Sequence, residues 1–186
     1  LSAGATRPVS AIHEDRLGRF WIGTRDASLY QFDSRTGELE AKFTREPGVS
    51  KIRAIAEDPQ GSLWFGGRYG LSRWDGTSLE SFTSHPLLEG AGITCLTWSD
   101  SGTLFAGTGD GRVVKHTAAG FETVESPAGE PDSPISGILV GDDGTLWVAT
   151  LGDGLHLLKD GWQHVFNTDT GLPDNRLTAL AAGNDD

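Results

Sequence analysis

The 186-residue chain repeats one short phrase four times at a nearly constant interval. The phrase is a glycine, a variable residue, an apolar residue and an aromatic residue, followed two positions later by glycine or alanine. Its aromatic residues lie 43, 41 and 42 residues apart, at Trp21, Trp64, Phe105 and Trp147. A period of this length indicates an architecture in which each repeat packs on the next.

A second set of positions keeps the same register. Nine residues before each aromatic residue, a short alternating run ends at Ile12, Ile55, Leu96 and Ile138. A fifth such run, "LTAL", ends at Leu180, which lies 42 residues after Ile138. Within each period, apolar and polar residues alternate between turns rich in Asp and Gly, which is typical of antiparallel hairpins. No helical periodicity persists, so we expect essentially no helix.

Four antiparallel strands in about 42 residues form the period of a β-propeller blade. The sequence therefore predicts an all-β fold, a β-propeller segment of four four-stranded blades plus the first strand of a fifth. We expect 1–186 to form a single segment. Its blades fall at about 9–50, 51–91, 92–133 and 134–175, and the fifth starts in 176–186.

The repeated phrase has a structural interpretation that we favour over a catalytic one. The aromatic residue should fill the gap between neighbouring sheets, and the Gly or Ala after it should allow strands to approach closely. The glycine three positions before the aromatic residue should take a positive φ in a tight turn.

Composition excludes several classes of function. The net charge of −11, from 15 basic and 26 acidic residues, argues against nucleic acid as a partner. No apolar run approaches the roughly 20 residues of a membrane span, so we expect no membrane contact by this segment. The single cysteine, Cys95, lies in an apolar stretch and is expected to be a buried small hydrophobe.

We expect no catalytic residue, metal or cofactor. The five histidines lie at unrelated repeat positions, which disfavours a metal cluster. The Asp-Gly turns lack the spacing of a calcium-binding loop and are better explained as turn formers. No nucleophile motif is present.

Recognition is expected on one rim of the propeller. The loops between second and third strands and the linkers between blades vary from repeat to repeat, and variable loops on a rigid frame usually carry binding residues. The candidate ligand-binding residues are Arg25, Asp26, Arg68, Tyr69, Asp110, Asp153, Asn175 and Arg176. Tyr69, Arg68 and Arg25 would suit a sugar or an acidic polysaccharide through stacking and guanidinium–carboxylate pairing. Taken singly, each residue also fits an ordinary solvated loop position.

The repeat resembles that of the two-component regulator propeller family. The similarity is strongest in "TGLPDNRLTAL", from Thr170 to Leu180, and it covers almost the whole chain. The third repeat departs most, because Phe105 replaces Trp and the usual Gly-Leu and Asp-Gly pairs are missing. The resemblance implies a non-enzymatic sensor in the periplasmic or extracellular region of a bacterial hybrid histidine kinase or related regulator. Its implied ligand is an oligosaccharide or another small molecule.

Two other interpretations stay open at this point: a lyase-type propeller enzyme and a scaffold propeller that binds a protein. The resemblance also implies that a closed ring has more than four blades. An open arc would expose apolar packing faces, and such faces tend to find partners. We therefore expect self-association, or packing against the remaining blades of a longer parent chain.

Overall fold

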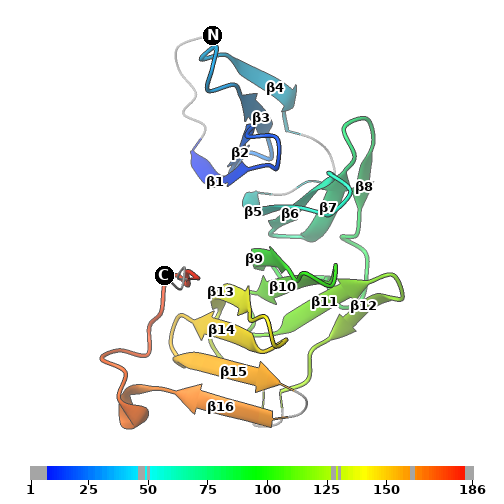
Figure 1. The fold of residues 1–186 in the computed structure, drawn as a ribbon. Helices are drawn as coiled ribbons and strands as arrows, with labels where there is room; N and C mark the ends of the chain where they lie inside the picture. Colours follow the sequence, from blue (N-terminus) through cyan, green and yellow to red (C-terminus); the bar gives the residue numbers. More distant parts are fainter. Residues whose placement is uncertain are drawn as a thin grey trace. The chain divides into compact units, whose positions relative to one another are not determined.

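The described part of the chain consists of short β-strands joined by turns and loops. The computed structural model describes residues 8–45, 49, 51–126, 129, 131–159 and 162–182, apart from the side chain of Trp162. It divides into two compact units, Leu1–Gly90 and Ala91–Asp186. Each unit holds two four-stranded antiparallel sheets, which are called blades below (Figure 1). The only helical element in the described part is the 3₁₀ turn η1 (Thr168–Thr170), so the all-β expectation is confirmed.

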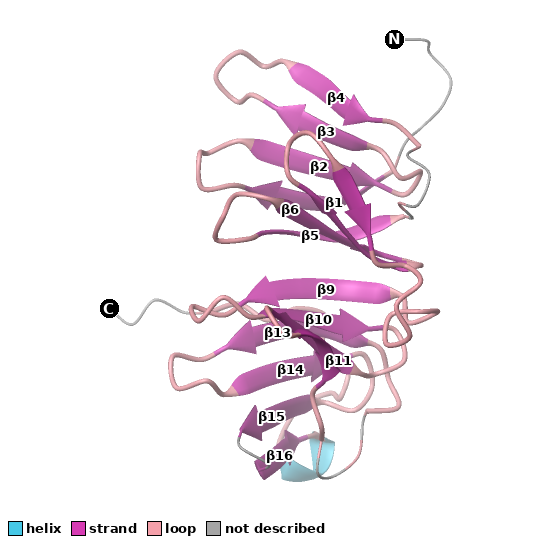
Figure 2. Cartoon of the chain, turned by 90° about the vertical axis from the view of Figure 1, so that its right-hand side faces the viewer, coloured by secondary structure: helices cyan, strands magenta, loops and turns pink. Residues whose placement is uncertain are grey.

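Strand order in space equals strand order in the chain in every blade, as Figure 2 shows for the fourth. The first blade contains β1 (Val9–Glu14), β2 (Phe20–Thr24), β3 (Leu29–Phe32) and β4 (Leu39–Phe43). The second contains β5 (Ile52–Glu57), β6 (Leu63–Gly67), β7 (Gly70–Trp74) and β8 (Leu79–Ser81). The third contains β9 (Ile93–Trp98), β10 (Leu104–Thr108), β11 (Val113–Thr117) and β12 (Gly120–Thr123). The fourth contains β13 (Ile135–Val140), β14 (Leu146–Thr150), β15 (Leu155–Lys159) and β16 (Trp162–Phe166).

No helix in the described part of the chain is long and apolar enough to cross a membrane.

The turn between the first and second strands of each blade is built around the predicted glycine. Gly18, Gly61, Gly102 and Gly144 all have a positive φ, between 72° and 93°. A side chain is strained in this conformation, which explains why the position is glycine in all four repeats.

A carboxylate in this turn holds the aromatic residue of the first two blades. Asp15 accepts hydrogen bonds from the Arg19 backbone N–H at 2.9 Å and from Trp21 Nε1 at 2.8 Å. Asp58 does the same with Ser62 N at 2.8 Å and Trp64 Nε1 at 3.1 Å. Burial alone would raise the pKa of Asp58, but these hydrogen bonds outweigh it and hold the pKa below its ordinary value.

The third and fourth blades lack this carboxylate. Ser99 stands in its place in the third blade, where it accepts from Thr103 N at 3.1 Å, and Phe105 has no N–H to offer. The fourth blade has Gly141 at this position, and its Trp147 is 37% exposed, whereas Trp21 is 2% exposed. The indole is therefore anchored only in the blades that supply an aspartate.

The second glycine of the phrase allows one blade to pack closely on the next. A Cβ on Gly107 would lie 2.6 Å from Cγ2 of Ile135, the first residue of β13. A Cβ on Gly23 would lie even closer to Cγ2 of Ile52, the first residue of β5. Both isoleucines are at most 1% exposed. The predicted close approach of strands is thus a contact between consecutive blades.

The predicted first strand of a fifth blade, in 176–186, is not formed over residues 176–182, and 183–186 lie outside the described residues. The segment still runs beside the fourth blade. Leu177 N donates to Thr150 O at 2.8 Å, and Ser136 Oγ donates to Leu177 O at 2.6 Å. Ser10 makes the equivalent bond to Ile52 O. A strand forms only where another strand pairs with it in a hydrogen-bonded ladder, and the described residues provide no such partner for this segment.

The packing role of Gly107 can be tested by adding one methyl group. We expect Gly107→Ala to lower the free energy of unfolding by about 1–3 kcal/mol, because the methyl must displace Ile135 or Cys95 in a packed core. Ala149→Gly makes the reverse change at the matching position of β14 and should cost about 1 kcal/mol. Urea unfolding of both variants measures these effects. A Gly107→Ala chain as stable as the natural chain would show that Ile135 does not need the glycine.

Each unit leaves apolar residues of an outer sheet face exposed. Val9 and Ile12 of β1 are 54% and 66% exposed, and Trp147 of β14 is 37% exposed. Between the first and second blades the corresponding faces pack on each other. Ile52 of β5 packs on Gly23 of β2, and Trp74 of β7 contacts Trp21 of β2. We propose that a second copy of the chain covers the exposed residues, the β1 face of one copy packing on the β14 face of another.

Light scattering after size exclusion should therefore give a mass that rises with protein concentration. Ile12→Lys and Trp147→Lys change exposed side chains and should each shift the chain toward the monomer. A monomeric mass at every concentration would contradict the proposal.

Candidate functional site

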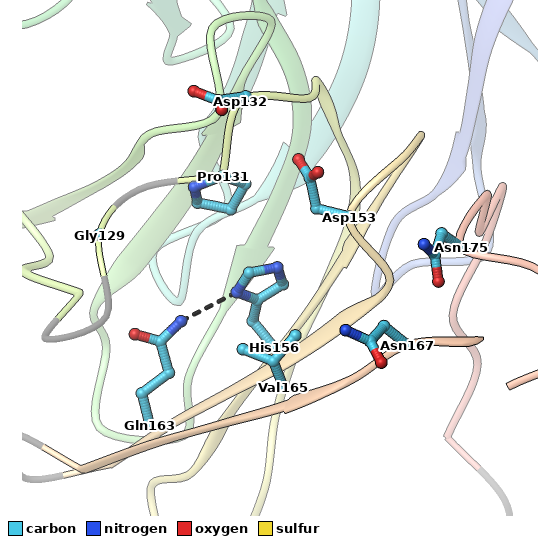
Figure 3. A pocket seen from close by; sticks show the side chains of 9 residues that line it. All are labelled: Gly129, Pro131, Asp132, Asp153, His156, Gln163, Val165, Asn167 and Asn175. Carbon is cyan, nitrogen blue, oxygen red and sulfur yellow. Dashed lines mark hydrogen bonds between the residues drawn. The ribbon is translucent and has the colours of Figure 1, made fainter. Parts of the chain in front are cut away.

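A pocket of about 280 Å³ opens within the second unit (Figure 3). Its walls come from four places: the linker before β13, the loop between β14 and β15, the hairpin β15–β16, and the segment after β16. The lining residues are Gly129, Pro131, Asp132, Asp153, His156, Gln163, Val165, Asn167 and Asn175.

His156 of β15 forms the most buried polar part of the pocket and is 6% exposed. Its Nδ1 lies 2.9 Å from Nε2 of Gln163, as the dashed line in Figure 3 marks. Gln163 Oε1 in turn accepts a hydrogen bond from Ser126 Oγ at 2.6 Å. With the amide N–H donating to Nδ1, the proton of the neutral imidazole lies on Nε2.

Nε2 of His156 is left without a partner. It is buried, and the backbone of Asp153 lies near the ring, but no partner within the described part of the chain meets the geometry of a hydrogen bond. Burial lowers the pKa of His156, and the backbone and charge of Asp153 oppose that effect only in part, so the ring is neutral at neutral pH. Buried polar groups are almost always paired, so we expect an unpaired N–H beside a pocket to be a contact point for a ligand oxygen.

Asp153 and Asp132 bring two carboxylates to the pocket. Asp153 Oδ2 accepts from Ser133 N at 2.8 Å, and its own N–H donates to Thr150 Oγ1 at 2.8 Å. These bonds fix the carboxylate between its loop and the preceding linker. Asp132 is exposed on that linker. Figure 3 shows both carboxylates on the same side of the His156 ring.

Two asparagines complete the polar wall. Asn175 Oδ1 accepts from Thr168 N at 2.7 Å, and Asn167 Oδ1 accepts from Asp169 N at 3.0 Å, where it caps η1. Their oxygens are thus used in folding the segment after β16. In Figure 3 their amide nitrogens point toward the pocket.

Of the expected rim residues in the second unit, the structure brings Asp153 and Asn175 together in this pocket. Asp110 instead closes its own loop, because its carboxylate accepts from Thr108 Oγ1 at 2.5 Å and pairs with Arg112 at 2.9 Å. Arg176 is exposed, and its backbone N–H donates to Asp174 at 2.9 Å.

The other four expected rim residues lie in loops of the first unit. Asp26 accepts from Thr24 Oγ1 at 2.6 Å, as Asp110 does in its blade. Arg25 is exposed, and its backbone N–H donates to Pro8 O at 3.0 Å. The Arg68 guanidinium lies 5.8 Å from the centre of the Tyr69 ring, which is 57% exposed. Tyr69 therefore already has a cationic neighbour on an accessible surface.

Sequence reasoning missed His156, Gln163, Asn167 and Asp132. It placed recognition on loops, whereas the base of the pocket is formed by the outer strands of a blade. One feature of the sequence could have identified His156. His156 pairs with Val148 in the position that Tyr30, Ser72 and Val114 occupy in the other blades, so this strand position also varies.

Neither a metal-binding cluster nor the single cysteine offers an alternative site in the described residues. No group of three or more His, Cys, Asp or Glu among them could hold a metal ion. Burial raises the pKa of the Cys95 thiol to about 11, which leaves it almost entirely protonated at neutral pH.

A family model described as two component regulator propeller matches the chain at residues 4–26, 47–69 and 129–152. These stretches include the first and second strands of the first, second and fourth blades. The third blade, in which Phe105 replaces tryptophan, lies outside the matched stretches. No curated protein matches the sequence.

Solved structures of several kinds of protein share the fold, among them lyases and extracellular domains of two component systems. A catalytically inactive virginiamycin B lyase from Staphylococcus aureus with quinupristin is 18% identical with a TM-score of 0.76, over 96% of this chain and 61% of the lyase. The extracellular domain of the putative hybrid two component system BT3049 from B. thetaiotaomicron is 19% identical with a TM-score of 0.75, over 96% of this chain and 25% of that one. A domain of the BT4673 system from the same organism is 16% identical with a TM-score of 0.76, over 98% and 26%. These likenesses show the fold alone, and the chain spans less than two thirds of each relative.

Proposed function

Because the chain carries two component regulator propeller repeats, we propose that it is a non-enzymatic sensor propeller that binds a carbohydrate in the periplasm or outside the cell. The likeness to extracellular domains of two-component systems supports the sensor role and the location. The observation that carries the binding function is the unpaired, buried Nε2 of His156 beside a polar pocket.

The pocket matches the chemistry of sugar hydroxyls, each of which both donates and accepts a hydrogen bond. His156 Nε2 and the amide nitrogens of Asn167 and Asn175 supply donors. The carboxylates of Asp132 and Asp153 supply acceptors. Pro131 and Val165 add small apolar surfaces for the C–H groups of a sugar ring.

Binding would also connect two parts of the second unit. The linker before β13 is already held to the fourth blade by the bonds from Ser126 to Gln163 and from Ser133 to Asp153. A ligand that touches Asp132 and His156 together would add a third connection. We propose that this stiffening of the linker is how occupancy of the pocket is passed to neighbouring parts of the regulator.

Thermal unfolding in the presence of mono- and disaccharides tests the proposal. At least one sugar should raise the unfolding midpoint, because a ligand that binds only the folded chain stabilises it. His156→Leu should weaken that binding about tenfold or more, since a hydrogen bond worth about 1.5 kcal/mol is lost in a largely buried position.

His164→Leu is the matched control. His164 is exposed on β16 and lies next to Gln163 in the chain, so its side chain points to the opposite face of the sheet. This variant should bind as the natural chain does. The proposal fails if no sugar raises the midpoint, or if His156→Leu binds as tightly as His164→Leu. The recovered sugar should have an unchanged mass, and a changed mass would favour the lyase-type alternative.

A further inference from the structure

Almost all of the net negative charge lies in the second unit. Residues 91–186 contain 14 acidic and four basic residues, so they account for −10 of the total charge of −11. Between Lys115 and Lys159 the sequence has no lysine or arginine at all. The unit that contains the pocket therefore has a strongly negative field, which attracts cations and repels anions.

The pocket itself has the same character. Asp132 and Asp153 line it, and none of its nine lining residues is lysine or arginine. His156 is neutral, so it does not offset the two carboxylates. A ligand with a carboxylate, sulfate or phosphate would meet like charge without compensation. A ligand with a positive group would meet two acceptors, because Asp153 Oδ1 and the Asp132 carboxylate are not used by the described residues.

The deeper part of the pocket carries hydrogen-bond donors, so it suits an acceptor on the ligand rather than a cation. The buried Nε2–H of His156 needs an acceptor, and the amide nitrogens of Asn167 and Asn175 are also donors. A metal ion would need lone pairs at these positions, so it does not suit this wall. A hydroxyl oxygen suits it well. The pocket thus combines a place for a cation with a place for hydroxyls.

We propose that the ligand is an amino sugar, bound with its protonated primary amine beside Asp132 and Asp153 and a hydroxyl on His156. This inference rests on the proposed function and narrows it to one class of carbohydrate. An ammonium group has three donors and no acceptor, which suits a pocket lined by two carboxylates.

Calorimetric titration of the full chain at pH 7 and low salt tests the charge requirement with simple probes. Glucosamine should bind about fivefold to tenfold more tightly than glucose, because a charge-assisted hydrogen bond adds to the hydroxyl contacts. N-acetylglucosamine, which keeps the skeleton but loses the charge, should bind no better than glucose. Glucuronate should bind most weakly, and methylamine, which lacks hydroxyls, should give no measurable binding. High salt should reduce the preference for glucosamine.

Asp132→Asn assigns the preference to the pocket. Asp132 is exposed, so its replacement leaves the fold intact, and the preference for glucosamine over glucose should fall to within about twofold. Glucose should lose less affinity than glucosamine, because the amide oxygen that Asp132→Asn introduces still accepts a hydrogen bond from a hydroxyl but carries no charge. Asp100→Asn removes the same charge from the exposed turn between β9 and β10, away from the pocket, and should keep the full preference.

Failure of the inference is distinguishable from failure of the proposed function. If glucose binds as tightly as glucosamine and His156→Leu weakens both, the pocket binds carbohydrate but the amine requirement is overturned. Methylamine binding as tightly as glucosamine, or a full preference retained in Asp132→Asn, overturns it as well. If no sugar binds, the proposed function fails and the inference fails with it.

Discussion

Each unit depends on one close contact, in which an isoleucine of one blade packs against the backbone of the blade before it. Ile135 occupies the space that a side chain at Gly107 would fill, and Ile52 does the same at Gly23. This contact fixes β13 beside β10, and the linker between the third and fourth blades must then cross the end of the sheet. Ser126 and Ser133 of that linker reach Gln163 and Asp153, so the wall of the pocket follows from how the blades pack.

The proposed binding site lies where one blade departs from the repeat. The second residue of β15 is His156, and the matching positions of the other blades hold Tyr30, Ser72 and Val114. The frame around this position is the same in every blade, because it depends on turn glycines and strand alternation. A repeat protein can therefore gain a site by changing single side chains on a strand, while its loops keep structural roles such as those of Asp26 and Asp110.

Local features were predictable from the sequence, and features that depend on distant neighbours were not. The "VVKHT" strand and the positive φ at Gly102 follow from alternation and turn geometry within a few residues. Asp153 and Asn175 were found because they lie in variable loops. His156 and Gln163 were missed because their meeting depends on the register of β15 with β16 and on the path of the linker. The exposure of Trp147 and the missing ladder in 176–182 depend on what covers the sheet, which local pattern does not encode.

The central claim is that the pocket around His156 is the ligand site, and ¹⁵N NMR of the histidine ring nitrogens tests it most directly. During titration with glucosamine, the Nε2 resonance of His156 should move in proportion to occupancy, because its N–H gains an acceptor. The ring of His164 should keep its resonances. A sugar that raises the unfolding midpoint yet leaves His156 Nε2 unchanged would place binding elsewhere on the chain and contradict the account.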